Sequence, residues 1–453
     1  MTAPRLPLTL LLAVTSLLSA CRSDPAAPTP ARADTRLSVA ATPTPTEATA
    51  TPKLTDLTAT YPGGTQPRTL ALDKSVPLIL VHGLGGWGRD EGLGLRYWGG
   101  LLDVQADLRA QGYTVYTASL GPVSSNWDRA AELYAQIRGG CVDYGAAHAQ
   151  THGHAQKDTK KCYAGFYPGW DATRPVNLLG HSMGGQTARL LVKLLDDGDA
   201  ANRASGGLFT GGRAGWVRNV MTVSSPNSGS PAADTLQDSI PMFKNLILAF
   251  ASSVGGLDPE NFVYDFDLGH WGLSRAAGET FTSYNTRVFN SGIWTSRDQA
   301  AYDLSVDGSA ALNTYVGRSR TTKYFSWETN ATSRGLVSGW HYPNLTMNAV
   351  LSPIAYPYAW PLKPGLGNIS GRSPGGIGYD SSWWANDGIV PNRSMNAPLG
   401  QSSAAYTGQI TAPGSWYRLG RVDGYDHIDI TGNLSFRDVK AFYRNQAAFL
   451  AGQ

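Results

Sequence analysis

The chain has 453 residues, of which 42% are hydrophobic and 16% are charged, so it can bury a large core in one globular domain. Its 52 glycines and 27 prolines predict many loops. The formal net charge of +3 comes from 37 basic and 34 acidic residues that are spread along the chain. Without a basic block there is no stripe that could follow a phosphate backbone, which argues against a nucleic-acid partner.

The first residues have the pattern of an export signal. Arg5 precedes a mostly apolar run, Leu6 to Leu18, that is too short to span a bilayer. Leu18-Ser-Ala-Cys21 follows and resembles the bacterial lipobox, in which the cysteine becomes the lipidated N-terminus. We therefore predict a signal peptide over residues 1–20, lipidation of Cys21 and an exported protein. A lipid anchor would make it a membrane-associated lipoprotein of the cell envelope, whereas ordinary cleavage nearby would make it secreted.

Residues 21–66 are rich in proline, threonine and alanine, as in the run from Ala40 to Thr49. Such a segment cannot bury enough apolar surface to fold, so it is expected to be a flexible tether. The folded domain is then predicted to cover residues 67–453.

Stretches with strand and helix character alternate after the tether. The predicted elements are a strand at Val76–Val81, a helix near Leu101–Gln111, a strand at Tyr113–Ser119, and strands at Val176–Leu179 and Val217–Val223. This alternation predicts an α/β fold with a mostly parallel central sheet. Residues 250–400 give few clear elements, and helical spacing returns at Phe436–Phe449, which is predicted to close the domain.

Cysteine usage agrees with export. With Cys21 assigned to the lipobox, Cys141 and Cys162 remain as an even pair, for which a disulfide is expected outside the reducing cytosol. Two free thiols or two zinc thiolates are the alternative interpretations of this pair.

Ser182 lies in Gly180-His-Ser-Met-Gly184, which fits the pattern G-x-S-x-G. The motif has the context that it needs, because a predicted strand precedes it and helical spacing follows it. A serine in this position sits on a tight turn with its hydroxyl projecting from the sheet edge, so Ser182 is a candidate nucleophile.

A serine nucleophile needs a base, an acid and an oxyanion hole. In this fold class the acid and then the histidine follow the serine along the chain, and His427 is the only histidine that comes late enough. Asp387 is the candidate acid, with Asp380 and Asp423 as rivals. The backbone amides of Met183 and Leu84 are the candidate oxyanion donors.

Several sequence blocks resemble the true bacterial lipases of family I.5, the Bacillus, Geobacillus and staphylococcal group. They include Pro77–Arg89, Tyr97–Gly100, Gly121–Arg129, Val142–His148, His181–Arg189 and Asn386–Val390, and the resemblance covers roughly residues 76–445. It implies an α/β-hydrolase fold with a small inserted zinc-binding subdomain and a helical lid, and a catalytic triad of Ser182, Asp387 and His427.

The resemblance also implies metal sites. A structural zinc in this family is bound by two aspartates and two histidines, and the matching residues here are Asp128, His148, His154 and Asp298. Four protein ligands leave no open position on a tetrahedral zinc, so this ion would hold together a subdomain of about residues 125–168 and 275–300.

A calcium site is the second metal site that the family implies. Its matching positions here are the Thr346 carbonyl and Asp429, and Asn433 could replace a missing aspartate through its amide oxygen. The lost charge should weaken such a site, so calcium is an open question at this stage.

A lid is expected over about residues 232–258, where Phe243, Leu246, Ile247, Phe250 and Val254 share a helical face. A helix packed in the core is the plainer interpretation. The similarity to the family instead implies an apolar cover that opens at a lipid–water interface.

Together these patterns predict a triacylglycerol lipase that cleaves carboxylic esters of lipids through an acyl-enzyme. The alternatives are a carboxylesterase or phospholipase A1 of the same fold, a zinc-dependent hydrolase that uses the histidine cluster, and an inactive lipid-binding surface protein.

Overall fold

The computed structural model describes residues 72–89, 91, 94–237, 264–359, 363–410, 412–433, 435 and 437–453. The predicted signal peptide, tether and Cys21 lie outside these residues, and so does the predicted lid from residue 238 onward. Within the described ranges, no helix has both the length and the apolar character needed to cross a membrane.

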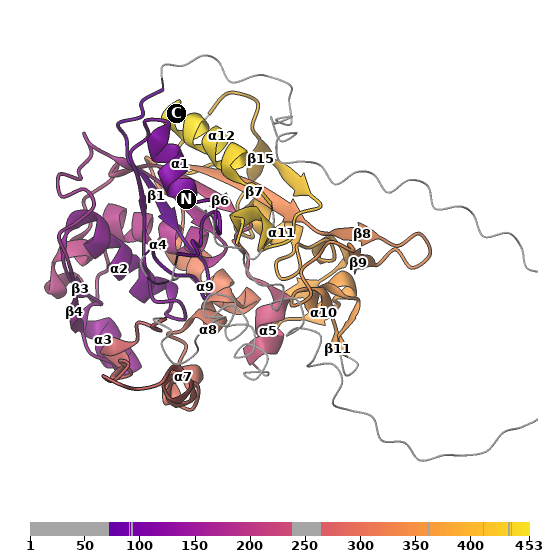
Figure 1. Ribbon diagram of the computed structural model, residues 1–453, viewed down its shortest axis with the longest axis horizontal. Coiled ribbons are helices and arrows are strands. Elements are labelled where there is room, and N and C mark those ends of the chain that lie inside the picture. Colours follow the sequence, from indigo (N-terminus) through magenta and orange to yellow (C-terminus); the bar gives the residue numbers. More distant parts are fainter. Residues whose placement is uncertain are drawn as a thin grey trace, which may run out of the picture. The chain divides into compact units, whose positions relative to one another are not determined.

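A seven-stranded sheet forms the centre of the domain, in the order β14-β15-β7-β6-β5-β1-β2 (Figure 1). Every neighbouring pair of strands is parallel, which confirms the predicted α/β fold. The strands are β1 (Leu78–Val81), β2 (Val115–Thr117), β5 (Val176–His181), β6 (Val217–Val223), β7 (Lys323–Asn330), β14 (Ser403–Ala405) and β15 (Trp416–Asp423).

Alternate residues of each strand pack into different cores. In β1, Leu78 and Leu80 join a core on one face of the sheet, whereas Ile79 and Val81 join a core on the other. Helices α1 (Val104–Ala110) and α12 (Lys440–Ala451) cover the first face, where Figure 1 shows them side by side. Helices α2 (Asn126–Arg138) and α4 (Met183–Asp197) cover the second. Since both faces are buried, the β1 run is uniformly apolar and does not alternate in the sequence.

The strands of the C-terminal half were not predicted because their sequences are mixed in polarity. Strand β7 reads KYFSWETN, yet it lies in the middle of the sheet and is mostly buried. Its polar groups find partners that are distant in sequence: the Ser326 hydroxyl donates to the Asn396 carbonyl at 2.8 Å, and the Trp327 indole donates to Gln446 at 2.8 Å. Satisfied polar groups can be buried at little cost, and no local pattern reveals these partners.

A small subdomain projects from the sheet beside α2. It contains the antiparallel pair β3 (Gly140–Asp143) and β4 (Lys157–Tyr163) and the helix α3 (Ala146–His152) between them. Cys141 and Cys162 are cross-strand neighbours joined by a disulfide. The buried Lys161 ammonium lies 2.6 Å from Glu132 of α2 and donates to the Asp267 carbonyl at 2.8 Å, so β4 is tied both to α2 and to a distant segment.

The remaining elements surround the carboxyl ends of the strands or join the layers. The helices are α5 (Pro231–Gln237), α7 (Phe281–Phe289), α8 (Ala300–Leu304), α9 (Val306–Val316), α10 (Ser352–Ala355) and α11 (Asn392–Asn396). The short antiparallel pairs are β8 (Thr332–Arg334) with β9 (His341–Pro343), β10 (Tyr358–Ala359) with β11 (Lys363–Pro364), and β12 (Gly371–Arg372) with β13 (Gly378–Tyr379).

Candidate active site

Ser182 lies on the tight turn between β5 and α4. Its φ of 55° is in the left-handed region, which a residue with a side chain rarely adopts. The turn is possible because two glycines flank it: a Cβ on Gly180 would lie 2.4 Å from the Gly184 carbonyl carbon, and one on Gly184 would lie 2.1 Å from the Val81 carbonyl oxygen. The chain therefore passes close to β1 and presents the serine hydroxyl at the carboxyl edge of the sheet.

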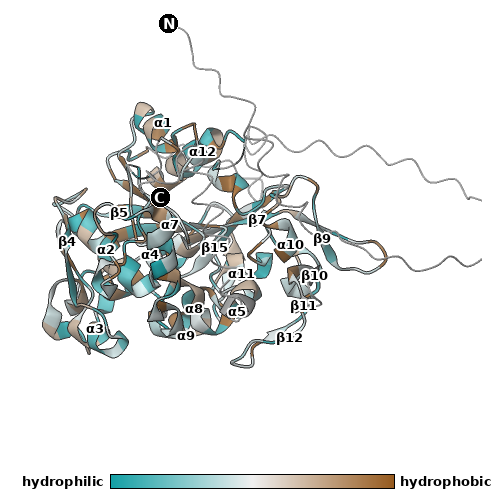
Figure 2. Ribbon diagram, turned by 60° about the horizontal axis from the view of Figure 1, so that its bottom comes forward, coloured by the Kyte–Doolittle hydropathy of each residue, from teal (hydrophilic) through white to brown (hydrophobic). Residues whose placement is uncertain are grey.

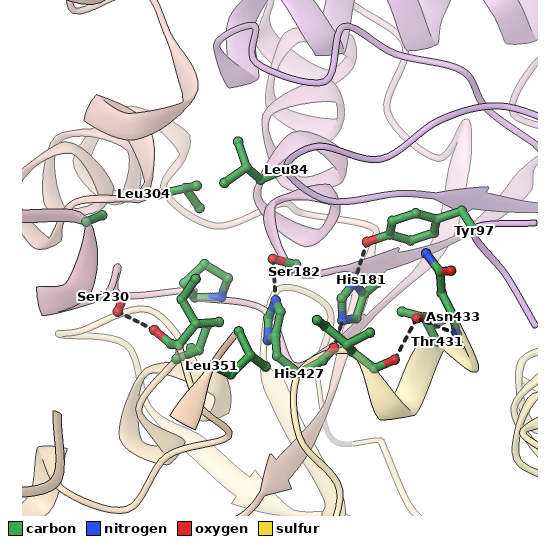
Figure 3. A pocket seen from close by; sticks show the side chains of 15 residues that line it. Leu84, Tyr97, His181, Ser182, Ser230, Leu304, Leu351, His427, Thr431 and Asn433 are labelled. Atoms are coloured by element: carbon green, nitrogen blue, oxygen red, sulfur yellow. Dashed lines mark hydrogen bonds between the residues drawn. The ribbon is translucent and has the colours of Figure 1, made fainter. Parts of the chain in front are cut away.

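The three residues predicted as a triad form one continuous chain of hydrogen bonds. The Ser182 hydroxyl lies 2.8 Å from Nε2 of His427 (Figure 3). Nδ1 of His427 lies 2.7 Å from Oδ2 of Asp387. All three side chains are buried, with Asp387 completely so. This arrangement lets the imidazole accept the serine proton while the carboxylate fixes the ring and its tautomer.

The structure also distinguishes Asp387 from its rivals. The carboxylate of Asp387 accepts the Thr329 hydroxyl at 2.8 Å and the Val390 amide at 2.9 Å in addition to His427. Asp380 and Asp423 are both exposed, and their carboxylates bind Ser382 and Arg421. Of the three aspartates, only Asp387 contacts the histidine.

A mostly apolar pocket opens beside the Ser182 hydroxyl (Figure 3). Leu84 lies on one wall of this pocket, and Met183 begins α4 directly after the serine. The amides of the first helical turn have no partner within the helix, so the Met183 N–H can donate to a developing oxyanion. The other apolar lining residues are Pro226, Ala233, Leu304, Leu351, Ile389, Val390 and Ile428. Such a lining suits the hydrocarbon part of an ester.

Two further residues support the triad, and the sequence analysis did not assign them a role. The Gly83 amide donates to the Tyr97 hydroxyl at 3.0 Å, and this hydroxyl donates to Nδ1 of His181 at 2.6 Å. Burial, reinforced by the nearby His427, lowers the pKa of His181 well below its usual value. His181 is therefore neutral and donates from Nε2 to the His427 carbonyl at 3.0 Å. These hydrogen bonds link the loop that carries Leu84 to the backbone of His427. The sequence signals for the two residues were their places in the family-like blocks Tyr97–Gly100 and His181–Arg189, which gave no role.

We expect Tyr97→Phe to lower kcat on a soluble ester about tenfold with little change in KM, because it leaves the Gly83 amide and His181 without partners. Steady-state kinetics on p-nitrophenyl butyrate measure this effect. The control is Tyr315→Phe, which removes a hydroxyl bonded to the surface residue Asp199 and should leave kcat unchanged. An unchanged kcat in Tyr97→Phe would mean that the hydroxyl does not position the site.

The four predicted zinc ligands converge in the small subdomain. One ligand atom from each of Asp128, His148, His154 and Asp298 lies within 4.8 Å of the others. These four side chains come from α2, from α3 and the turn after it, and from the loop before α8. Another histidine of this region, His270, is not a member of the group but bonds Asp128 at 2.8 Å through Nε2.

The donor atoms fit a metal ion. Oδ1 of Asp128, Nε2 of His148, Nε2 of His154 and Oδ2 of Asp298 are all buried and make no hydrogen bond. Buried polar atoms without partners are costly, and four that face one another indicate a shared ligand. The Nδ1 atom of His154 lies 2.9 Å from the Ala155 carbonyl, which fixes the tautomer that leaves Nε2 free for the ion. Two imidazoles and two carboxylates match the preference of zinc for tetrahedral sites.

The three residues suggested for calcium differ from one another in their contacts and in their exposure to solvent. Oδ2 of Asp429 is 3.0 Å from the Arg437 guanidinium, Asn433 lines the active-site pocket, and Thr346 is exposed. A carboxylate that the sequence analysis omitted, Asp426, lies beside Asp429. Burial, reinforced by repulsion from Asp429, raises the pKa of Asp426 to about 6.

Comparison with known proteins gives consistent matches over the folded domain. Residues 74–452 match a family model described as "Lipase-like, C-terminal domain". Lipase 2 of Staphylococcus aureus is 36% identical over 395 residues, which are 83% of this chain and 53% of that protein. The chain thus spans about half the length of the curated relatives that it matches.

Solved structures match the fold as well as the sequence. The structure of EstA from Clostridium botulinum is 37% identical with a TM-score of 0.78, and the match covers 87% of this chain and 92% of that one. Lipase 1 from Pelosinus fermentans is 39% identical with a TM-score of 0.72, covering 83% of this chain and 98% of that one. The family model, which spans residues 74–452, includes the seven-stranded sheet and the site residues described above.

Proposed function

The chain belongs to the family of lipase-like C-terminal domains whose model matches residues 74–452. We propose that it is a triacylglycerol lipase, which hydrolyses carboxylic esters of lipids. The observation that carries the proposal is the hydrogen-bonded chain from Asp387 through His427 to Ser182 at an apolar pocket. A charged or polar substrate would gain little from this lining, whereas an acyl chain is stabilised by leaving water.

The proposed reaction proceeds through an acyl-enzyme. The Ser182 hydroxyl attacks the ester carbonyl carbon while Nε2 of His427 takes its proton, and the amides of Leu84 and Met183 hold the oxyanion. The tetrahedral intermediate collapses as His427 returns the proton to the leaving alcohol. A water then attacks the acyl-enzyme, His427 takes the water proton, and the fatty acid leaves as Ser182 regains its hydrogen.

We propose zinc as the ion held by Asp128, His148, His154 and Asp298. With four protein ligands the zinc would supply no reactive water, and its contribution would be to hold the subdomain together. We propose a calcium site near the catalytic histidine, with Asp429, Asn433 and Thr346 as the suggested ligands and the neighbouring Asp426 as a further one. The Arg437 guanidinium, 3.0 Å from Asp429, would have to turn away for the ion to bind.

We also propose that the protein is exported and that it works on aggregated lipid. The signal-like first residues and the lipobox-like sequence that ends at Cys21 support a lipid-anchored form, and the tether would let the domain reach substrate away from its anchor. The predicted lid, which from residue 238 lies outside the described residues, would open at the lipid–water interface.

The dependence of activity on the acyl-chain length of the ester tests the substrate class. We expect hydrolysis of emulsified triolein and of long-chain p-nitrophenyl esters, with activity rising as the substrate aggregates, because the acyl group must fill an apolar pocket. Titration of released fatty acid measures the first and absorbance the second. High activity on short soluble esters alone would favour a carboxylesterase, and selective release of one acyl chain from phospholipid would favour a phospholipase A1.

A further inference from the structure

The β8–β9 hairpin carries one leucine and one valine whose side chains face solvent. Leu336 and Val337 lie at its outer end, and both are fully exposed. The hairpin extends away from the helices around the sheet (Figure 1), and its outer end is coloured hydrophobic in Figure 2. Soluble proteins expose single apolar residues often, but two adjacent ones at the end of a projecting hairpin suggest a surface that they contact.

The hairpin end, residues 335–339, is held in one conformation. The Gly335 amide donates to the Trp340 carbonyl at 2.7 Å, and the Gly339 amide donates to the Gly335 carbonyl at 3.0 Å. The Ser338 hydroxyl lies 3.1 Å from the Tyr342 hydroxyl. Because the turn is already ordered, little conformational entropy would be lost when the two apolar side chains insert into another phase.

Further exposed apolar residues follow the hairpin along the chain, before it reaches the active-site pocket. The chain leaves the hairpin at Pro343 and reaches Leu351, which lines the pocket beside Ser182. Between them Leu345 is fully exposed and Val350 is partly exposed. Tyr356 directly follows α10, and its ring lies 6.2 Å from that of Tyr342. One continuous segment therefore connects the hairpin end with the pocket wall.

The charge pattern of this segment fits a lipid surface. No aspartate or glutamate occurs from residue 329 to residue 379, where the charged residues are Arg334, Lys363 and Arg372. A carboxylate would resist transfer to an apolar phase and would repel the fatty acids that hydrolysis releases, whereas arginine and lysine are attracted to them. Trp340, Tyr342 and Tyr356 are of the amphipathic aromatic type that favours the boundary between lipid and water.

From these observations we propose that the β8–β9 hairpin end docks on the lipid–water interface, with Leu336 and Val337 inserted, and holds the pocket mouth against the lipid. This rests on the proposed function for the identity of the surface. The hairpin would contact the lipid without any movement, whereas the expected lid would have to open first.

Vesicle binding tests the proposal without catalysis. The full chain with Cys21→Ser and Ser182→Ala, which removes the acyl anchor and prevents hydrolysis, is floated with phosphatidylcholine vesicles. Adding Leu336→Ser and Val337→Ser should lower the partition coefficient at least about tenfold, because two apolar side chains no longer leave water. The loss should persist at high salt. Leu72→Ser, which alters a half-exposed leucine located before β1, is the control. Added to the chain with Cys21→Ser and Ser182→Ala, it should leave vesicle binding unchanged.

Three results would overturn the proposal: unchanged binding, an equal loss in the Leu72→Ser control, or a dimer that the hairpin substitutions dissociate while vesicle binding stays the same. The last result would identify a second copy of the chain as the occupant. With Ser182 intact, the hairpin variant should keep its activity on monomeric p-nitrophenyl butyrate, which shows that it folds. If the chain with Ser182 intact hydrolysed no ester, the proposed function would fail, yet vesicle binding would still decide the role of the hairpin.

Discussion

Ser182→Ala should lower kcat for ester hydrolysis by on the order of a millionfold. The hydroxyl lies 2.8 Å from Nε2 of His427, and without it the proposed acyl-enzyme cannot form. The oxyanion donors remain, which should leave a weak residual rate above that of water. The variant should fold normally, since alanine is smaller than serine and the φ of the turn is set by its neighbours.

Turnover of p-nitrophenyl butyrate and triolein by matched preparations measures this effect. Ser230→Ala is the control, because Ser230 also lines the pocket but donates to the Ile389 carbonyl at 2.5 Å and does not contact His427. The control should change kcat by less than about tenfold. Activity in Ser182→Ala that matched the control would rule out Ser182 as the nucleophile.

Removal of one metal ligand should cause the largest loss of stability. Asp298→Ala should lower the free energy of unfolding by about 3–5 kcal/mol, because Asp128 stays buried without the cation that compensates its charge. Chelation of the ion from the unmodified chain should give a similar loss, since the ion binds the folded state alone.

Calorimetry with and without a chelator measures both effects. The melting temperature of the unmodified chain should fall on chelation and recover with added zinc, whereas that of Asp298→Ala should be low and insensitive to the chelator. Asp171→Ala, which alters an exposed aspartate, is the control. Metal analysis should find about one zinc per chain in the control and little in Asp298→Ala. If chelation abolished turnover while the melting temperature stayed unchanged, the metal would be catalytic and the structural role would be wrong.

The N-terminal half of the sheet and the nucleophile could be predicted because their signals are local. The apolar run before Ser182 is buried on both faces, and its two flanking glycines are required where the helix approaches β1, so the motif shows its own geometry. The resemblance to family I.5 lipases was confirmed by the family model and by relatives of 36–39% identity. Strand β7 was missed because its polar residues bond to partners more than fifty positions away.

The sequence by itself determined the fold class and placed Ser182 on a tight turn between a strand and a helix, because these elements follow from short-range sterics and periodicity. The residues of the metal group came from the resemblance to the family I.5 lipases. The order of residues along the chain left three aspartates open as the acid, and the family resemblance pointed to Asp387, whose contact with His427 the tertiary structure shows. Only the tertiary structure decided that Tyr97 and His181 join the Leu84 loop to the histidine backbone, and that Leu336 and Val337 face solvent. Each of these depends on distances between residues that are remote along the chain. Such distances are set by how the layers pack around the sheet, which no local pattern encodes.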